Sequence, residues 1–239
     1  MSVALSVVVP VKDEAANVGP LAREIAAALA TEAPHEIIFI DDGSSDGTGD
    51  ALAGLKSEIP VLRVLRHERN LGQSRGIRSG VAAARGDVII TLDGDGQNDP
   101  ADIPKLLRLL EADPKVGLVS GVRTKRKDTA SRRLASKAGN AFRNWMLKDG
   151  AADTGCGLKA FRREVFLSLP YFDHIHRFLI TLTLREGWQV RFVPVNHRPR
   201  TAGQSKYTNF GRLLVSGADL MGVRWLLRRH RGPAGVREL

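Results

Sequence analysis

Two aspartates separated by a single glycine, Asp93 and Asp95, follow directly on the apolar run 88–92. An ionised carboxylate is costly to bury unless something compensates its charge, so packing alone does not explain two of them at the end of a buried strand. Carboxylate oxygens are hard ligands that suit Mg²⁺ or Mn²⁺, and either ion would in turn hold a phosphate-bearing ligand. The alternative is a turn with two solvated carboxylates, and this short pattern alone does not separate the two interpretations.

Polar side chains also follow two earlier apolar runs. Residues 12–14 come after the run 5–10, and Asp41 and Asp42 come after the run 36–40. A carboxylate at the position of Asp42 can accept hydrogen bonds from ribose hydroxyls or from a base N–H, and the ligand interpretation is favoured there. A turn with a helix N-cap is instead favoured for three nearby hydroxyl side chains, Ser44, Ser45 and Thr48.

The segment 70–76 opens a predicted helix and contains two glycines and Arg75. A helix N-terminus of this kind can attract phosphate, but a cap with close helix packing explains it equally well. The segment has neither the G-x-x-x-x-G-K-[ST] nor the G-x-G-x-x-G pattern, which argues against a P-loop and against a nicotinamide-dependent enzyme.

Strand-like and helix-like patterns alternate through the first half of the chain. Strands are expected at 5–10, 36–40, 61–65, 87–92 and 116–120, with helices at 17–30, 50–56, 73–84 and 102–110. This alternation predicts an α/β fold with a mostly parallel sheet covered by helices on both faces. Ligands of such sheets lie beyond the carboxyl ends of the strands, where all three polar clusters fall.

The second half of the chain is less regular. It contains a basic, helical stretch at 125–148, a short element at 161–169, a helix at 176–186, a strand at 190–195 and a last helix at 207–229. Basic side chains of the first stretch could dock a phosphate or lipid headgroups, or could form a solvated face: Arg132, Arg133, Lys137 and Arg143. His176 and His197 could bind phosphate or make a structural hydrogen bond, and Cys156 is expected to pack.

Size and composition limit the possible functions. The chain has 239 residues, enough for one large domain with or without a tail, and a formal net charge of +10 that favours an anionic partner. Aromatic residues make up only 5%, which argues weakly against a surface that stacks single-stranded bases. The single cysteine favours a reducing compartment. Neither a leader nor an apolar stretch of about 20 residues is evident, so a cytoplasmic protein, soluble or peripheral on a membrane, is expected.

Several motifs occur in the order and spacing found in family 2 glycosyltransferases of the GT-A fold, which the chain resembles over about residues 4–215. The first set comprises residues 10–14, 40–48, 70–72 and 93–100. The second set comprises residues 121–123, 153–157, 159–161, 176–178 and 203–207. The second set is similar to the polyprenyl-phosphate branch, which includes dolichyl-phosphate mannosyltransferase and undecaprenyl-phosphate sugar transferases. The resemblance implies a Rossmann-like central sheet.

The resemblance also assigns roles to individual positions. It implies a donor site that holds the nucleoside and diphosphate of a UDP- or GDP-linked sugar, formed by Pro10, Lys12, Glu14, Asp42, Asp93, Gly94, Asp95 and Gln97. The Mg²⁺ or Mn²⁺ ion would lie at Asp95 and Gln97. The acceptor phosphate would lie at Arg123, Arg133, Arg200, Ser205 and Lys206. Catalysis would rest on Asp93, Asp95, Arg123, Arg200 and Lys206.

Three departures from the family pattern affect these roles. Lys12 stands where an aromatic residue is usual, so stacking on the base is not expected, and Asp13 replaces the usual Asn, so the base cannot be read. The Q-x-x-R-W signature of processive synthases is absent, since Met221 occupies the Gln position before Arg224 and Trp225. Its absence favours the transfer of a single sugar.

Together these features predict an inverting, metal-dependent transfer of one sugar from a nucleotide sugar to a polyprenyl phosphate at the cytoplasmic membrane face. A lipid phosphate is already ionised at neutral pH, so it requires positioning more than deprotonation. Alternatives are a saccharide or another lipid as acceptor, or a non-catalytic module that binds nucleotide sugars or nucleic acid. The carboxylates in the presumed cleft argue against nucleic acid as a partner.

The chain is expected to divide into a GT-A domain at 1–206 and a C-terminal amphipathic helix with a basic tail at 207–239. The expected apolar side of this helix comprises Leu213, Leu214, Leu220, Met221, Trp225 and Leu227. Arginines lie beside it, so the helix could rest on a membrane surface. It could also dock on the core or on another chain, including a membrane partner protein; membrane contact is slightly favoured.

Overall fold

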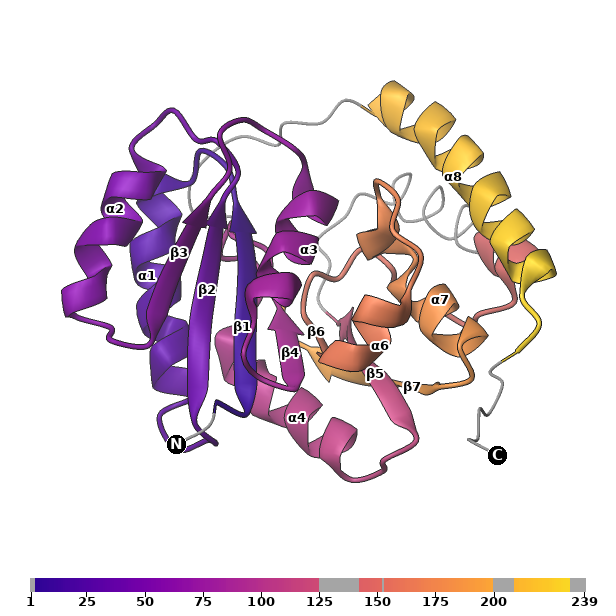
Figure 1. Cartoon of the computed structure of the whole chain (residues 1–239), viewed down its shortest axis with the longest axis horizontal. Coiled ribbons are helices and arrows are strands. Elements are labelled where there is room, and N and C mark those ends of the chain that lie inside the picture. Colours follow the sequence, from indigo (N-terminus) through magenta and orange to yellow (C-terminus); the bar gives the residue numbers. More distant parts are fainter. Residues whose placement is uncertain (1–2, 125–141, 152, 200–208, 233–239) are drawn as a thin grey trace, which may run out of the picture.

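The computed structural model describes residues 3–124, 142–151, 153–199 and 209–232, with side chains of the last segment described from residue 217. The described residues form a seven-stranded sheet in the order β3-β2-β1-β4-β6-β5-β7 (Figure 1). The strands are β1 Leu5–Val11, β2 His35–Asp41, β3 Leu62–Arg66, β4 Val88–Thr91, β5 Val116–Arg123, β6 Lys159–Arg162 and β7 Gln189–Val195.

All neighbouring strands pair in parallel except β6, which runs antiparallel to both β4 and β5. The expected mostly parallel sheet is therefore confirmed. The short element expected at 161–169, for which the sequence indicated no type, comprises the end of the strand β6 and the helix α6, Arg163–Ser168.

Helices cover both faces of the sheet, as expected. The α-helices are α1 Ala15–Ala28, α2 Thr48–Gly54, α3 Gln73–Ala83, α4 Ile103–Glu111, α6 Arg163–Ser168, α7 Leu179–Arg185 and α8 Asn209–Arg229. Short 3₁₀ turns lie at Leu55–Ser57, Pro100–Asp102 and Ile175–Arg177, and residues 142–147 are also helical. The remainder of the basic stretch, 125–141, lies outside the described residues.

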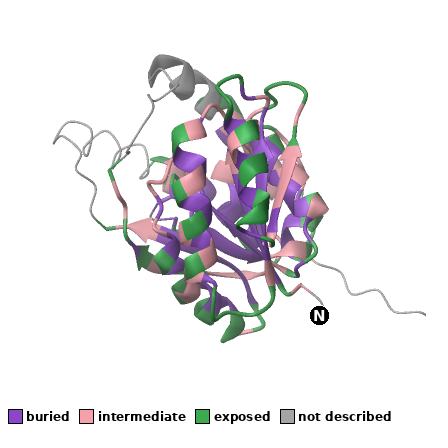
Figure 2. Ribbon diagram, turned by 90° about the vertical axis from the view of Figure 1, so that its left-hand side faces the viewer, coloured by how far each residue is buried: buried purple, intermediate pink, exposed green. Residues whose placement is uncertain are grey.

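Two apolar layers separate these helices from the sheet. Side chains of α1, α2 and α4 pack on one face, where Val7 and Val9 of β1 point, whereas α3, α6 and α7 pack on the other face with Val8. Successive side chains of a strand point to opposite faces, so a β1 buried on both faces reads as a continuous apolar run. Figure 2 shows the buried residues concentrated in the sheet and on the inner sides of the helices.

The C-terminal helix α8 is present, but its expected apolar side is divided. Leu220 and Val223 are buried in the layer that contains α7, whereas Met221 and Trp225 are exposed. At about 100° per residue, Met221 and Trp225 lie on a different side of the helix from Leu220 and Leu227. The side chains of Leu213 and Leu214 lie outside the described residues. None of the helices in the described ranges is both long enough and apolar enough to cross a bilayer.

Candidate active site

The loop that carries Asp93 and Asp95 begins at the carboxyl end of β4. The backbone N–H of Asp93 donates to Asn98 Oδ1 at 3.1 Å, and the N–H of Gln97 donates to Asp95 Oδ1 at 3.1 Å. Gln97 Nε2 also donates to the carbonyl oxygen of Arg198 at 3.4 Å. These bonds give the loop a fixed shape at the edge where β1 and β2 also end.

Asp93 is held in place from two sides. Gln73 Nε2, at the start of α3, donates to Asp93 Oδ1 at 2.8 Å. On the other side Gly157 lies so close that a Cβ atom there would be 2.2 Å from Asp93 Oδ2. Burial, followed by the neighbouring Asp95 carboxylate, raises the pKa of Asp93 to about 6.

Two cations and a further carboxylate lie behind Asp93. Arg123, the last residue of β5, donates through Nε and Nη2 to the two oxygens of Asp153 at 2.7 and 2.8 Å. Lys159, the first residue of β6, is buried and donates through Nζ to the carbonyl oxygen of Cys156. Burial lowers the pKa of Lys159, and the acidic neighbours Asp93 and Asp153 oppose this effect. The antiparallel strand β6 therefore brings compensating charge to the D-x-D loop.

Asp42 organises the loop that follows β3. Its Oδ1 accepts from Leu71 N at 2.9 Å and lies 2.7 Å from His67 Nδ1, and its Oδ2 accepts from Gly72 N at 2.8 Å. His67 was not anticipated from the sequence, because no motif includes it. The buried carboxylate thus joins the ends of β2 and β3, and it fixes the position of the predicted segment 70–72.

The polar residues after β1 join the loop after β2. Lys12 Nζ donates to the carbonyl oxygen of Gly43 at 2.9 Å, and Glu14 N donates to Thr48 Oγ1 at 2.9 Å. Asp13 N donates to Ser44 Oγ at 2.9 Å. The hydroxyls of Ser44 and Thr48 thus accept from backbone amides of the neighbouring loop. They do not form the expected helix N-cap, because the N-cap of α2 is Gly47 and has no side-chain cap bond. Pro10 lies in β1, just before this loop.

The structure overturns the expectation for one basic residue and favours one of the two alternatives for another. Arg143, expected to dock phosphate or to be solvated, instead points inward and binds both oxygens of Asp149 at 2.9 and 2.6 Å. His176 Nδ1 lies 2.7 Å from Ser74 Oγ, and burial, with Lys159 and Arg177 nearby, lowers the pKa of His176 to about 3. A neutral imidazole offers phosphate no charge, so its structural interpretation is the one the geometry favours. Cys156 is buried among apolar neighbours.

Several expected acceptor-site residues lie outside the described residues: Arg132, Arg133, Lys137, Arg200, Ser205 and Lys206. The residues that the structure brings together are Asp93 and Arg123, with Gln73, Asp153 and Lys159 as additions. Asp153 and Lys159 lie in segments that the resemblance matched without giving them a role. The signals that could have drawn attention to them are the D-x-G-x-G spacing of 153–157 and a lysine within the otherwise apolar run 158–161.

Oxygen donors dominate the D-x-D loop. Asp95 offers a carboxylate and Gln97 a side-chain carbonyl, both of which suit Mg²⁺ or Mn²⁺. Within the described ranges no three His, Cys, Asp or Glu side chains are grouped to hold a metal ion. Mg²⁺ commonly binds through one or two carboxylates together with the phosphates of a substrate, and this donor set fits such a mode.

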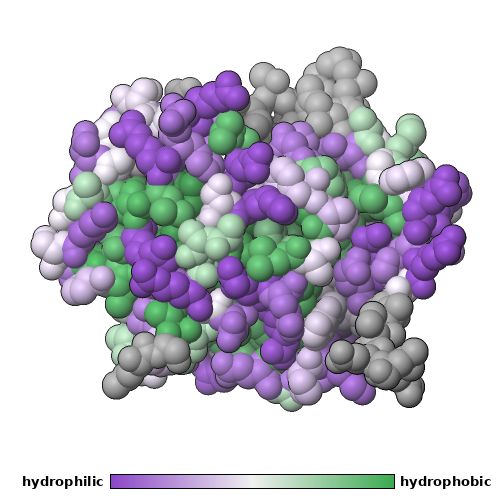
Figure 3. Space-filling model, viewed as in Figure 1, coloured by the Kyte–Doolittle hydropathy of each residue, from purple (hydrophilic) through white to green (hydrophobic). Residues whose placement is uncertain are grey.

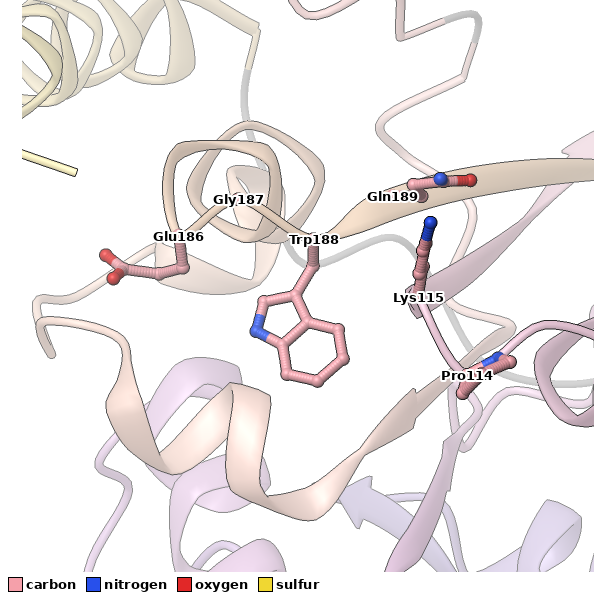
Figure 4. Close-up of a pocket in the computed structure, with 6 residues that line it drawn as sticks. All are labelled: Pro114, Lys115, Glu186, Gly187, Trp188 and Gln189. Atoms are coloured by element: carbon pink, nitrogen blue, oxygen red, sulfur yellow. The ribbon is translucent and has the colours of Figure 1, made fainter. Parts of the chain in front are cut away.

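Two of the surface hollows in the described part of the chain bear on the location of the site. One, of about 430 Å³, lies beside the Asp42 loop and is lined by Arg66, His67, Glu68, Arg69, Leu71 and Arg75. The other, of about 330 Å³, lies at the amino ends of β5 and β7, away from the D-x-D loop, and Trp188 forms one wall of it (Figure 4). Of these two, the first lies next to the candidate site, because His67 and Leu71 also contact Asp42.

Comparison with known proteins gives consistent matches. The sequence model of glycosyl transferase family 2 matches residues 6–169. A dodecaprenyl-phosphate galacturonate synthase of Rhizobium johnstonii is 34% identical, with 97% of this chain and 70% of that protein covered. An undecaprenyl-phosphate 4-deoxy-4-formamido-L-arabinose transferase of Pectobacterium carotovorum subsp. carotovorum is 36% identical, with 91% and 66% covered.

A solved structure shares the fold. Glucosyl-3-phosphoglycerate synthase from Mycobacterium tuberculosis, in complex with Mn²⁺, UDP and glucosyl-3-phosphoglycerate, superposes with a TM-score of 0.71 at 19% identity. The match covers 97% of this chain and 81% of that one. The GT-A fold expected from the sequence is confirmed.

Proposed function

The chain belongs to glycosyl transferase family 2, and from this premise we propose that it transfers one sugar from a nucleotide-sugar donor to the phosphate of a polyprenyl phosphate. Relatives that are 34% and 36% identical are named as polyprenyl-phosphate sugar transferases, and they support this choice of acceptor. The observation that carries the proposal is the D-x-D loop of Asp93 and Asp95, backed by Arg123, Asp153 and Lys159 at the carboxyl edge of the sheet.

On the donor side, the residues after β1 and β2 would bind the nucleoside and those after β4 would bind the diphosphate. Pro10, Lys12, Glu14 and Asp42 border the first position, and Asp95 and Gln97 border the second. Mg²⁺ or Mn²⁺ held by Asp95 and Gln97 would supply positive charge for the departing diphosphate. Asp93 would keep the loop in position through its bond from Gln73.

On the acceptor side, the reaction would be a direct displacement with inversion. An oxygen of the lipid phosphate would form a bond to the anomeric carbon while the bond from that carbon to the nucleoside diphosphate breaks. The electron pair leaves with the diphosphate, and no proton has to be removed from an ionised phosphate. Arg123, Arg133, Arg200, Ser205 and Lys206 are proposed to position it, and the reaction would take place at the cytoplasmic face of a membrane.

The experiment is a transfer assay with the full chain, radiolabelled UDP- and GDP-sugars, and two acceptor classes, short-chain polyprenyl phosphates in detergent and free saccharides. The proposal predicts a labelled, mild-acid-labile lipid product with at least one donor. Product formed only with saccharides would contradict the choice of acceptor, and no product with any pair would contradict the proposed sugar transfer.

A further inference from the structure

We propose that the second half of α8 and the neighbouring helix 142–147 form one aromatic-basic face that binds the surface of an anionic lipid bilayer. The face consists of Phe142, Trp145, Met221, Trp225, Arg228 and Arg229. It goes beyond the proposed sugar transfer, because it is argued from exposure, anchoring and charge on elements away from the D-x-D loop.

The apolar members of this face are unusually exposed. Phe142, Trp145, Met221 and Trp225 have exposed fractions of 56%, 69%, 69% and 58%, whereas the other exposed large hydrophobic residues of the described ranges reach only 36–41%. The rings of Phe142 and Trp145 lie 5.9 Å apart. Concentration of the most exposed apolar side chains on two elements indicates a binding surface rather than scattered exposure.

The packed sides of the two helices hold these side chains outward. Arg143 anchors the first helix to Asp149, and Leu220 and Val223 anchor α8 in the core. Arg224 Nη1 donates to the carbonyl oxygen of Met146 at 3.4 Å and thereby joins the two helices. The exposed residues therefore occupy the outer sides of elements that are well packed underneath.

The positive charge of this face favours an anionic partner. Arg228, Arg229 and Arg231 follow Trp225, and the Arg229 guanidinium lies 5.8 Å from the centre of the Trp225 ring. Asp219, the one acid among residues 217–232, is engaged by His174 at 3.0 Å. Over the second half of α8, strongly hydrophilic side chains lie beside apolar ones (Figure 3).

An anionic bilayer surface matches this combination. Aromatic rings and Met side chains insert at the level of the headgroups, and long cationic side chains reach the lipid phosphates. A second copy of the chain fits less well, because a two-fold contact would bring the arginines of both copies into one interface, and the face itself contains no acid to pair with them.

The chain provides its own control, because it has three tryptophans: Trp145, Trp188 and Trp225. Trp188 lies in the hollow with Pro114 and Lys115, on other elements (Figure 4). In full-length variants that retain one tryptophan each, with Phe at the other two positions, emission is measured with vesicles of brominated phosphatidylglycerol and phosphatidylcholine. Quenching by about half or more is expected for Trp145 and Trp225, with little for Trp188, because interfacial helices bury their apolar face about 5–10 Å deep.

Equal quenching of all three tryptophans, no quenching, or equal quenching in purely neutral vesicles would overturn the proposal. W145S with W225S should weaken vesicle binding about tenfold or more, whereas the matched control L184S with F192S should not. R228Q with R229Q should likewise weaken it about tenfold, and K115Q with R191Q should not.

Two further measurements separate this proposal from its rivals. The parent chain could dimerise in a concentration-dependent way, lose this dimerisation in the double variant W145S with W225S, and fail to bind vesicles. That result would assign the face to a second copy and overturn the bilayer proposal. Sugar transfer to a short-chain acceptor in detergent should survive W145S with W225S. Vesicle binding without any sugar transfer would contradict the proposed function and leave this face supported.

Discussion

At the scale of single residues, the candidate site depends on paired charges more than on any one side chain. Arg123 and Asp153 form a two-point contact at 2.7 and 2.8 Å, and Lys159 lies buried beside them. Such charges are tolerated in the interior only when each has a partner. The pair therefore holds the end of β5 and the loop before β6 in the arrangement that supports Asp93.

Removal of one partner tests this arrangement. Asp153→Asn leaves the Arg123 guanidinium with a neutral neighbour, and we expect a loss of about 3 kcal/mol in the free energy of unfolding. Urea titration of both proteins measures it. Glu58→Gln removes the partner of Arg23 in an exposed pair and should leave the urea midpoint unchanged. An equal effect of the two substitutions would show that the Arg123 contact is an ordinary surface pair.

His176 makes the stability of the fold depend on pH. Its pKa is about 3 in the folded chain, below the usual 6.5, so between these values the unfolded state binds more protons than the folded state. Stability is therefore fully present above about pH 6.5 and is lost as the pH falls. We expect the wild type to lose about 1–2 kcal/mol more than His176→Asn between pH 7.5 and 5.

Chemical denaturation of the wild type and His176→Asn at several pH values measures this difference. Between pH 7.5 and 8.5 the two unfolding free energies should differ by a constant amount. If the curves stay parallel down to pH 5, the imidazole is protonated as readily in the folded as in the unfolded state, and its proposed neutral role beside Ser74 is wrong.

The sequence predicted the carboxylates of the site but not the residues from distant segments that contact them. Asp42, Asp93 and Asp95 stand out because carboxylates directly follow apolar runs. His67 and Gln73 carry no such signal, since each becomes important only when the fold brings it to a carboxylate. Arg143 reads as part of a basic stretch, and only the tertiary structure pairs it with Asp149.

At the scale of elements, the parallel half of the sheet was predictable and its antiparallel strand was not. β1 and β2 read as strands because both faces are buried and their central residues, 7–9 and 37–40, form continuous apolar runs. β6 has four residues, begins with Lys159 and passes directly into α6, so its sequence carries no period-two pattern. The helix expected at 176–186 begins instead at Leu179, after a 3₁₀ turn.

The close packing of α3 on the sheet can be tested by adding one methyl group at Gly80. A Cβ atom on Gly80 would lie 2.4 Å from Val8 Cγ1, too close for an unstrained contact. We expect Gly80→Ala to destabilise the fold by about 1–3 kcal/mol, despite the better helix propensity of alanine.

Gly222 in α8 provides the matched control, because a Cβ atom there would meet nothing within 4 Å. Gly222→Ala should leave stability unchanged or raise it by up to about 1 kcal/mol. Thermal or urea unfolding distinguishes the two variants. A stabilising Gly80→Ala would mean that α3 does not lie against β1 as described.

At the scale of the whole molecule, two surfaces differ in their chemical character. The carboxyl edge of the sheet gathers carboxylates beside buried cations, whereas α8 presents aromatic and basic side chains on the outside of the β6-β5-β7 half (Figure 1). The net charge of +10 predicted an anionic partner but not its location. Which side of α8 is buried and which is exposed also depends on the core against which the helix packs. The sequence of the helix alone does not specify that core.

The most direct test of the account is sugar transfer to polyprenyl phosphate by the wild type and by Asp95→Asn, with Mn²⁺ or Mg²⁺ present and then removed by EDTA. Circular dichroism should first show that both proteins are folded. We predict a lipid-linked product from the wild type, its loss with EDTA, and a reduction of about a hundredfold or more in Asp95→Asn, because stabilisation of the leaving diphosphate is lost. An undiminished rate in Asp95→Asn, or transfer unaffected by EDTA, would contradict the account.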